Sequence, residues 1–339
     1  MLTSELINRV LATIPNRTVG LLGDLFLDRY LDIDPARDEP SVETGLTAYQ
    51  VTRVRSYPGA LGTVTNNLAA LGVGRIYPIA IIGDDGEGYE LMQALQRMPA
   101  VELGGIVRSS ERRTPTYTKP MYGEKELSRL DIKNRTPTPK ALEDSVLEFL
   151  EEAWPQFDAL IVLDQVSEED CGVVTGRVRE RLAELGAESP EKFVLADSRD
   201  QIARFKNVCV KPNGDELARL TITTVSGDFL LSSRRTVFAT EGANGMSVYH
   251  ATSVSGVPYQ LKAQIPAFPV AGPIDICGAG DSTSAGITSA MVAGLTHEQA
   301  AAFGNLVASI TIQQLGTTGT ASPEQVRKRW KEVSGLAGA

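Results

Sequence analysis

Short apolar runs alternate with helical patterns along most of this chain, and this alternation constrains the fold more than any other feature. Most of the runs are apolar throughout, as expected for strands that are covered on both faces. Helical patterns such as Leu142–Trp154 and Cys171–Leu185 lie between them. The sequence therefore predicts an α/β protein built from βαβ units around a mainly parallel sheet. The predicted strands are Val19–Gly23, Ile76–Ile82, Ala159–Leu163, Phe193–Ala196, Val208–Val210, Val237–Ala239 and Ser247–Tyr249.

The net charge limits the partners that the surface can attract. The 339 residues include 33 basic and 42 acidic side chains, which gives a formal net charge of −9. A surface of that sign repels phosphate backbones and anionic lipid, so we expect no nucleic-acid partner and no membrane partner. A phosphorylated ligand must then be held by a local site.

Histidine and cysteine are scarce in this sequence. The two histidines, His250 and His297, lie far apart, which disfavours a histidine-rich metal site and a Ser-His-Asp triad. The three cysteines show no CxxC spacing and indicate reduced thiols in a cytoplasmic protein. We expect both histidines to be structural or superficial and Cys277 to be a small buried thiol.

No targeting or membrane-spanning segment is expected. Glu5 and Arg9 interrupt the N-terminus before an apolar signal-peptide core could form. The longest uncharged run, Gln299–Pro323, contains several Asn, Gln, Ser and Thr residues. It therefore fits a buried helix and its loop better than a membrane span.

Capping residues mark three helix starts. Thr296–Gln299 matches a capping box, and Ser322–Gln325 combines an N-cap serine with a proline at the first helical position. Thr138–Pro139 predicts a third start.

Residues 32–57 and 107–131 break the βαβ pattern. Both stretches are rich in Pro, Thr, Arg and Tyr, and runs such as Tyr49–Arg55 resemble exposed strands. Neither stretch contains enough apolar residues to form its own core. We predict that together they form a small β element, a lid over the main sheet, within a single domain that spans residues 1–339.

Two common nucleotide-binding signatures are absent from the sequence. No Gly-Lys dipeptide occurs, which excludes a Walker A loop, and no G-x-G-x-x-G opens a helix after a strand. The sequence therefore disfavours a Walker-type NTPase and a Rossmann dehydrogenase.

The most informative stretch is Asp275–Asp281, D-I-C-G-A-G-D, which precedes a helix of small residues. The backbone N–H groups of Gly278, Ala279 and Gly280 can turn toward one point at a helix N-terminus. Unpaired donors and the helix dipole together stabilise an anion at such a point. Asp281 would lie at the mouth of that site, where it could accept a proton from an attacking hydroxyl. A tight turn followed by a first-turn helix acid is the simpler alternative.

This stretch resembles the D-x-x-G-A-G-D signature of the ribokinase-like (PfkB) carbohydrate kinase family, and the resemblance spans nearly the whole chain. Gly23–Tyr30 resembles the G-D-x-x-x-D-R-Y opening of the heptose-phosphate kinase branch. Pro58–Gly72 is similar to the glycine-rich substrate segment of that branch, and Thr114–Thr116 and Arg129–Asp131 are similar to its lid segments. The resemblance implies a three-layer α/β/α ribokinase-like fold with a mainly parallel central sheet and a small β lid.

The resemblance also implies the roles of the residues around the signature. In this family the glycine turn is an anion hole for the transferred phosphoryl group, and the last Asp of the signature is the catalytic base. By the same resemblance, ATP and Mg²⁺ are the expected cofactors. The residues expected on the sugar side are Asp24, Asp28, Gly59, Thr63 and Asn67.

Asp24 has both a functional and a plain interpretation. It ends the first predicted strand, where α/β sheets place ligand-binding groups, and by similarity would accept hydrogen bonds from sugar hydroxyls. A solvated loop acid is the alternative.

Nucleotide binding is implied by three further matches. An N-x-x-E motif helps to organise Mg²⁺ and phosphate in the family, often through water, so we expect Glu216 and Asp275 on the metal side. The same motif is also an ordinary capping pair, the nucleotide loop could be a hairpin turn, and the adenine-side Asn could satisfy a buried carbonyl. The expected nucleotide-binding residues are Asn213, Glu216, Thr240, Gly242, Gly245 and Asn305.

The chain departs from the family pattern at the substrate segment. Ala60 and Thr63 stand where the family usually has Gly and Asn. Alanine reaches a positive φ less readily than glycine, so a different hinge geometry is expected. The S-D-Y segment of heptose kinases is altered to Leu163–Gln165. These changes bear on the identity of the substrate more than on phosphoryl transfer.

We therefore predict an ATP- and Mg²⁺-dependent kinase that phosphorylates a hydroxyl of a sugar or sugar phosphate, with Asp281 as the base. Exposed lid strands would favour pairing, and in relatives such lids often pair between subunits, so a homodimer is expected. Two alternatives remain open at this stage. One is a catalytically silent sugar or nucleotide sensor, and the other is a nucleoside kinase.

Overall fold

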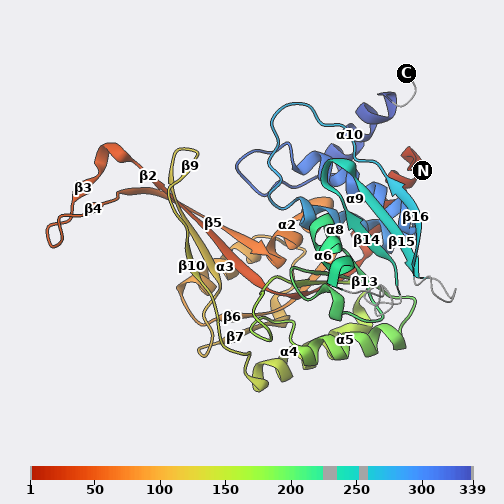
Figure 1. Cartoon of the computed structure of the whole chain (residues 1–339), viewed down its shortest axis with the longest axis horizontal. Helices are drawn as coiled ribbons and strands as arrows, with labels where there is room; N and C mark the ends of the chain where they lie inside the picture. The colour runs from red at the N-terminus through yellow and green to blue at the C-terminus, as the bar shows by residue number, and fades with distance from the viewer. Residues whose placement is uncertain (1, 224–234, 252–258, 337–339) are drawn as a thin grey trace.

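The computed structural model describes residues 2–223, 235–251 and 259–336. In this part of the chain a nine-stranded sheet runs in the order β16-β15-β14-β13-β12-β11-β1-β6-β7 (Figure 1). Strands β14 to β7 of this order are parallel, whereas β15 and β16 are antiparallel additions at one edge. The strands are β1 Thr18–Gly23, β6 Arg75–Gly83, β7 Ile106–Ser109, β11 Ala159–Asp164, β12 Phe193–Ser198, β13 Cys209–Val210, β14 Val237–Thr240, β15 Met246–Ala251 and β16 Tyr259–Ile265.

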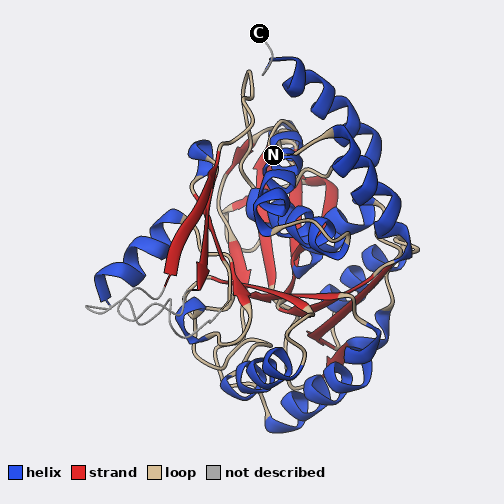
Figure 2. Ribbon diagram, turned by 90° about the vertical axis from the view of Figure 1, so that its right-hand side faces the viewer, coloured by secondary structure: helices blue, strands red, loops and turns tan. Residues whose placement is uncertain are grey.

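Helices cover both faces of this sheet and give three layers (Figure 2). One apolar core lies under α1, α2, α3, α8, α9 and α10, and the other lies under α4 and α5. Successive side chains of β1 enter opposite cores, since Leu21 faces the first and Leu22 the second. The predicted three-layer α/β/α fold is confirmed. The helices are α1 Ser4–Thr13, α2 Leu61–Leu71, α3 Gly86–Gln96, α4 Lys140–Ala153, α5 Gly176–Glu188, α6 Gly214–Thr223, α8 Ala279–Val292, α9 His297–Thr311 and α10 Pro323–Leu336.

All seven predicted strands are present, with ends that shift by no more than two residues. The helix predicted from Cys171 begins later, at Gly176, because Thr175 caps it by accepting a hydrogen bond from the Val178 N–H. The residues before Gly176 are not helical, and the Val173 N–H donates a hydrogen bond to the carboxylate of Asp24, which is distant in sequence. A local pattern does not reveal a partner so far away in sequence.

The capping predictions are confirmed at α9 and α10. The residues Thr296–Gln299 and Ser322–Gln325 each form a reciprocal cap, with distances of 2.8–3.3 Å between donor and acceptor. The third start is close to its predicted place, but Pro139 is the N-cap of α4 and the Thr138 hydroxyl donates to the Gly172 carbonyl instead.

The uncharged run forms the buried α9 and its following loop, as predicted. In the ranges that the structure describes, no helix combines the length and apolarity needed to cross a bilayer.

A second sheet stands beside the main one, in the order β10-β8-β2-β5 with β9 paired to β8. With the hairpin β3–β4, it extends away from the helices that cover the main sheet (Figure 1). It occupies most of the predicted β element, with two corrections. The sheet already begins at Leu25, and residues 106–109 belong to β7 of the main sheet. Its strands are β2 Leu25–Ile33, β5 Val51–Ala60, β8 Thr116–Tyr122, β9 Lys125–Glu126 and β10 Leu130–Ile132, and the hairpin is β3 Glu39–Pro40 and β4 Thr47–Ala48.

The second sheet joins α2 through a strained residue. Ala60 is the last residue of β5 and the N-cap of α2, with φ 51° and ψ −114°. This conformation costs an alanine about 1–3 kcal/mol, whereas glycine adopts it freely. Ala60 therefore carries strain at this junction that a glycine would not, in line with the expected difference in hinge geometry.

Replacing Ala60 with glycine should raise the free energy of unfolding by about 1 kcal/mol, because relief of strain exceeds the entropy that glycine loses on folding. Urea unfolding of the two proteins measures the change. Ala69→Gly in the last turn of α2 is the matched control and should lower stability by up to about 1 kcal/mol. A loss of stability in Ala60→Gly equal to that of the control would contradict the assignment of strain.

Candidate active site

The predicted anion hole lies at the N-terminus of α8. Gly278 is its N-cap in the left-handed region, with φ 76°, and α8 begins at Ala279. The Ala279 N–H donates to the Ile276 carbonyl, but neither the Gly280 N–H nor the Asp281 N–H has an acceptor within the described residues. These two donors and the helix dipole can hold an anion here.

Small residues allow α8 to run deep inside the molecule. Every residue from Ser282 to Ala290 is buried, and a Cβ added at Gly286 would lie 2.9 Å from the Gly304 Cα of α9. The small residues therefore let this helix pack closely against α9. The helix is fixed by its neighbours, so its N-terminus is fixed as well.

Asp281 lies in the first turn of α8 and is partly buried. Its carboxylate has no hydrogen-bond or ion-pair partner among the described residues. Burial, together with repulsion from Asp197 and Asp28, raises its pKa to about 7, although Lys211 and Arg199 oppose the shift. An unpaired carboxylate with a pKa near neutrality can accept a proton from an alcohol.

A buried ion pair beneath the α8 N-terminus was missed by the sequence analysis. Lys211 and Asp197 are 2.7 Å apart, and their side chains are 4% and 13% exposed. The Lys211 Nζ is so close to the turn that a Cβ added at Gly280 would lie 3.5 Å from it. Burial disfavours the ammonium, but attraction to Asp197, Asp281 and Glu216 outweighs this and raises the pKa of Lys211. A permanent cation therefore lies under the anion hole.

Several predicted sugar-side residues meet the α8 turn. A Cβ added at Gly278 would lie 3.1 Å from the Thr63 Cγ2, and one at Gly59 would lie 2.3 Å from the Asp28 Oδ2. The Asp28 carboxylate also contributes to the raised pKa of Asp281, so the two acids lie within range of each other's charge. Burial raises the pKa of Asp28 itself, against the pull of Lys119. The structure thus brings five predicted residues together from three separate segments.

Asp24 and Asn67 do not reach that space. Asp24 is 3% exposed, and its two oxygens accept N–H groups of Gln165, Val166 and Val173. It is therefore a buried brace for the loop after β11, which neither the sugar-binding nor the solvated-acid interpretation foresaw. Asn67 is fully buried, and its amide donates to the Thr63 carbonyl. In this conformation both Asp24 oxygens accept main-chain N–H groups, and the Asn67 side chain is closed off from solvent.

Basic side chains gather around Asp28 and the neighbouring tyrosines. Lys119 of β8 lies over the Tyr30 ring at 5.1 Å and attracts Asp28. Arg129 and Lys133 lie over the Tyr117 ring, at 4.9 Å and 5.7 Å. A cavity of about 140 Å³ next to them is lined by residues that include Asp24, Phe26, Arg112, Tyr117, Lys133, Gln165 and Arg199.

The predicted nucleotide-side residues lie on neighbouring elements. Asn213 and Glu216 cap α6 reciprocally, with both hydrogen bonds at 2.8 Å, and Asn213 pairs with Thr240 at the end of β14. Gly242 and Gly245 have positive φ values of 56° and 93° in the following turn, a conformation that glycine adopts without strain.

Asn305 of α9 serves the fold directly. Its amide donates to the carbonyls of Ile265 and Pro266, each at 3.2 Å. This is the buried-carbonyl alternative that the sequence analysis left open. Asp275 similarly braces the signature loop, since its two oxygens accept the N–H groups of Cys277 and Gly316 at 3.0 Å.

The acids near the anion hole fit a magnesium ion that is bound mainly through phosphate. In the described ranges, no three His, Cys, Asp or Glu side chains are arranged to hold a metal by themselves. Mg²⁺ on a nucleotide needs one or two carboxylates besides phosphate and water. Glu216 attracts Lys211, and one of its oxygens accepts the Asn213 N–H, whereas Asp275 uses both oxygens in the loop.

Cys277 corrects one expectation, because it is exposed rather than buried. It lies in the signature loop outside the α8 packing surface. The rings of the two histidines lie edge to face, with centroids 5.1 Å apart, although the residues are far apart in sequence.

Comparison with known proteins extends these observations. The model of the pfkB family carbohydrate kinases matches residues 26–325. The bifunctional protein HldE of Gluconobacter oxydans is 24% identical over 329 residues, which are 93% of this chain and 65% of that protein. HldE of Caulobacter sp. is 28% identical over 314 residues, 91% of this chain and 62% of that protein. The chain thus spans less than two thirds of the length of these relatives.

Solved structures share the fold. Ribokinase of Arabidopsis thaliana, complexed with ribose and ATP, has a TM-score of 0.65 at 18% identity, and the match covers 93% of this chain and 99% of that one. Ribokinase of Thermotoga maritima has a TM-score of 0.66 at 18% identity with the same coverage. A nucleoside kinase of Methanocaldococcus jannaschii has a TM-score of 0.60 at 17% identity, with coverage of 93% and 98%.

Proposed function

The chain belongs to the pfkB family of carbohydrate kinases, and we propose that it transfers the γ-phosphoryl group of ATP to a hydroxyl of a sugar phosphate. One observation carries this proposal. The unpaired carboxylate of Asp281 stands beside the free N–H groups at the start of α8, which is the arrangement that couples a general base to an anion site.

The proposed chemistry uses the groups of the site in order. The acceptor hydroxyl oxygen attacks the γ-phosphorus while its proton passes to an oxygen of Asp281. The bond from the γ-phosphorus to the bridging oxygen breaks, and ADP leaves with that electron pair. The N–H groups of Gly280 and Asp281, with the ammonium of Lys211, offset the charge on the transferring oxygens. When bound, Mg²⁺ supplies further charge compensation on the phosphates, and Glu216 would help to hold it.

The basic residues on the sugar side support a phosphorylated acceptor. The whole chain has a net charge of −9, so its long-range field repels a sugar phosphate. Lys119, Arg129, Lys133 and Arg199 nevertheless gather around Asp28, Tyr117 and the adjoining cavity. A local cluster of cations in an acidic protein fits the recognition of a phosphate group.

We propose that the second sheet also pairs two copies of the chain. Val54 and Leu130 of this sheet are 55% and 60% exposed, and Val42 and Leu46 of the hairpin are 102% and 72% exposed. Apolar side chains on open strands favour association with another chain. A monomer at all concentrations in analytical ultracentrifugation would exclude this pairing.

The experiment that tests the function is an ADP-release assay with ATP, Mg²⁺ and a panel of free sugars, sugar phosphates and nucleosides. Turnover with a sugar phosphate, confirmed by identification of the phosphorylated product, is the expected result. Nucleotide binding without turnover on any acceptor would favour the sensor, and turnover with a nucleoside alone would favour the nucleoside kinase.

The pH dependence should follow Asp281. A base accepts a proton only when ionised, and the pKa of this carboxyl is about 7. Therefore kcat/KM should fall about tenfold per pH unit below that value and level off above it. The residual turnover of Asp281→Asn should lack this acidic limb. An unchanged limb in that variant would assign the ionisation to another group.

A further inference from the structure

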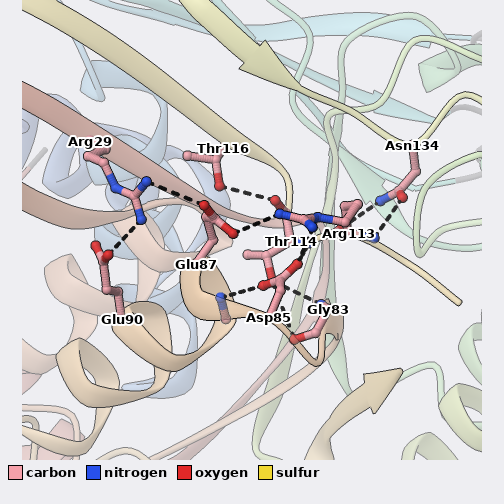
Figure 3. A network of polar contacts seen from close by, with 10 residues as sticks. Arg29, Gly83, Asp85, Glu87, Glu90, Arg113, Thr114, Thr116 and Asn134 are labelled. Carbon is pink, nitrogen blue, oxygen red and sulfur yellow. Dashed lines mark hydrogen bonds and ion pairs between the residues drawn. The ribbon is translucent and has the colours of Figure 1, made fainter. Parts of the chain in front are cut away.

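A compact polar cluster lies where the second sheet meets α3, outside the site described above (Figure 3). It consists of Arg29 from β2, Asp85, Glu87 and Glu90 from the start of α3, and Arg113 from the segment that leads into β8. We call these five residues the root cluster. It joins the chain segments on which the second sheet stands.

Arg29 ties β2 to α3. Its guanidinium reaches Glu90 at 2.6 Å and Glu87 at 3.4 Å, and its side chain is 18% exposed. Ser56 of β5 donates to the other oxygen of Glu90 at 2.8 Å. Ser56 is paired with Arg29 across the two strands, so both strands are tied to one acid.

Asp85 ties the segment before β8 to the same helix end. One of its oxygens caps α3 by accepting the Gly88 N–H at 2.7 Å, and the other accepts the Thr114 N–H at 2.9 Å. Arg113 adds ion pairs to Asp85 at 3.2 Å and to Glu87 at 2.9 Å. Burial raises the pKa of Asp85, but the hydrogen bonds from Thr114 and Gly88 and the charge of Arg113 outweigh it, so the net shift is downward.

The second sheet depends on such ties because it has little core of its own. Leu25 to Leu27 enter the main body, but beyond them β2 is only half-buried and much of β5 is exposed. Side chains alternate along a strand, so Asp28 and Arg29 lie on opposite faces of β2. Asp28 contacts Gly59, and its charge acts on Asp281, while Arg29 forms an ion pair with α3.

We propose that the root cluster is the device that positions the second sheet so that Asp28 faces Asp281. Its residues act through the orientation of β2 and touch no substrate. The proposal rests on the proposed function, since it treats Asp28 as an acceptor-binding group. Partly buried charges suit this task because their interaction is screened less than that of a surface ion pair.

Arg29→Gln is the decisive variant. It removes the charge that reaches both Glu87 and Glu90, so amide hydrogen exchange in residues 26–33 and 51–60 should become about tenfold faster, while β1 and β11 keep their protection. The KM for the sugar phosphate should rise about tenfold to a hundredfold, with the KM for ATP within about twofold of the wild type. Arg29→Lys keeps the positive charge but lacks the planar guanidinium that reaches two acids at once, so it should give an intermediate result.

Two further variants make the result decisive. Glu90→Gln perturbs a more exposed partner and should show the same pattern in milder form. Arg75→Gln breaks a 2.6 Å ion pair with Glu102 on β6, away from the second sheet, and should match the wild type in both assays. The proposal is overturned if hydrogen exchange in Arg29→Gln equals that in Arg75→Gln. It is also overturned if Arg29→Gln raises the KM for the sugar phosphate and the KM for ATP equally. Hydrogen exchange needs no turnover, so the proposal is decided even where the acceptor panel refutes the proposed function.

Discussion

Replacing Asp281 with asparagine should lower kcat by about 10²–10⁴-fold and leave the KM for ATP nearly unchanged. The amide has nearly the same shape as the carboxyl group but cannot take the proton of the attacking alcohol. Steady-state kinetics with the best acceptor of the panel provide the measurement. The large effect follows from the position of Asp281, whose carboxylate is unpaired and stands beside the free N–H groups of α8.

A folding defect can be separated from this loss. The raised pKa of Asp281 means that the folded state disfavours its ionised form. The neutral amide of Asp281→Asn should therefore not lower the free energy of unfolding measured at pH 8. Asp144→Asn, which alters a surface acid on α4 paired with Lys140 and Arg177, should keep normal turnover. Near-normal kcat in Asp281→Asn would remove this residue from the role of base.

Replacing Lys211 with methionine should lower the free energy of unfolding by about 3–5 kcal/mol. The change leaves the Asp197 carboxylate without its ammonium partner at a site where both side chains are almost fully buried. It also removes the cation that offsets the repulsion between Asp197 and Asp281. Chemical denaturation at pH 7 measures the loss.

The double variant Lys211→Met with Asp197→Asn is the matched control. It removes both charges and should recover most of the stability, because no unpaired ion then remains. Turnover should stay low in the double variant, since the cation under the anion hole is still missing. Wild-type stability in Lys211→Met alone would show that the ion pair contributes nothing to the fold.

The sequence predicted the central strands well because they are buried on both faces and therefore uniformly apolar. It did not predict β2, where polar residues such as Asp28 and Arg29 alternate between two faces that both make polar contacts. It also missed β16, although the alternating apolar and polar residues of that edge strand are typical of a half-buried strand, and it assigned most of β7 to the lid.

The site was predictable where short motifs carry it. Gly278 and Asp281 are adjacent in one signature, and Gly59 and Thr63 lie in another, so a match to each motif was enough to bring them together. Lys211 and Asp197 belong to no such signature. Their available signal was position: Lys211 follows β13 and Asp197 lies near the end of β12, and the carboxyl ends of these two neighbouring parallel strands meet at one edge of the sheet.

Asp24 shows why a motif match does not fix a role. It lies in the matched opening segment, yet its carboxylate is used by the N–H groups of Gln165 and Val173, about 140 and 150 residues away in sequence. Only the folded chain reveals a competition of this kind. The strain at Ala60 has the same origin, because the packing of β5 against α2 imposes a backbone that the residue itself does not favour.

The most direct test of the account is a crystal structure of the full chain with Mg²⁺, a non-hydrolysable ATP analogue and the best acceptor. The account predicts the γ-phosphate within hydrogen-bond distance of the Gly280 and Asp281 N–H groups, and the acceptor hydroxyl within about 3 Å of an Asp281 oxygen. A nucleotide bound away from α8, or an Asp281 carboxylate turned from the acceptor, would contradict it.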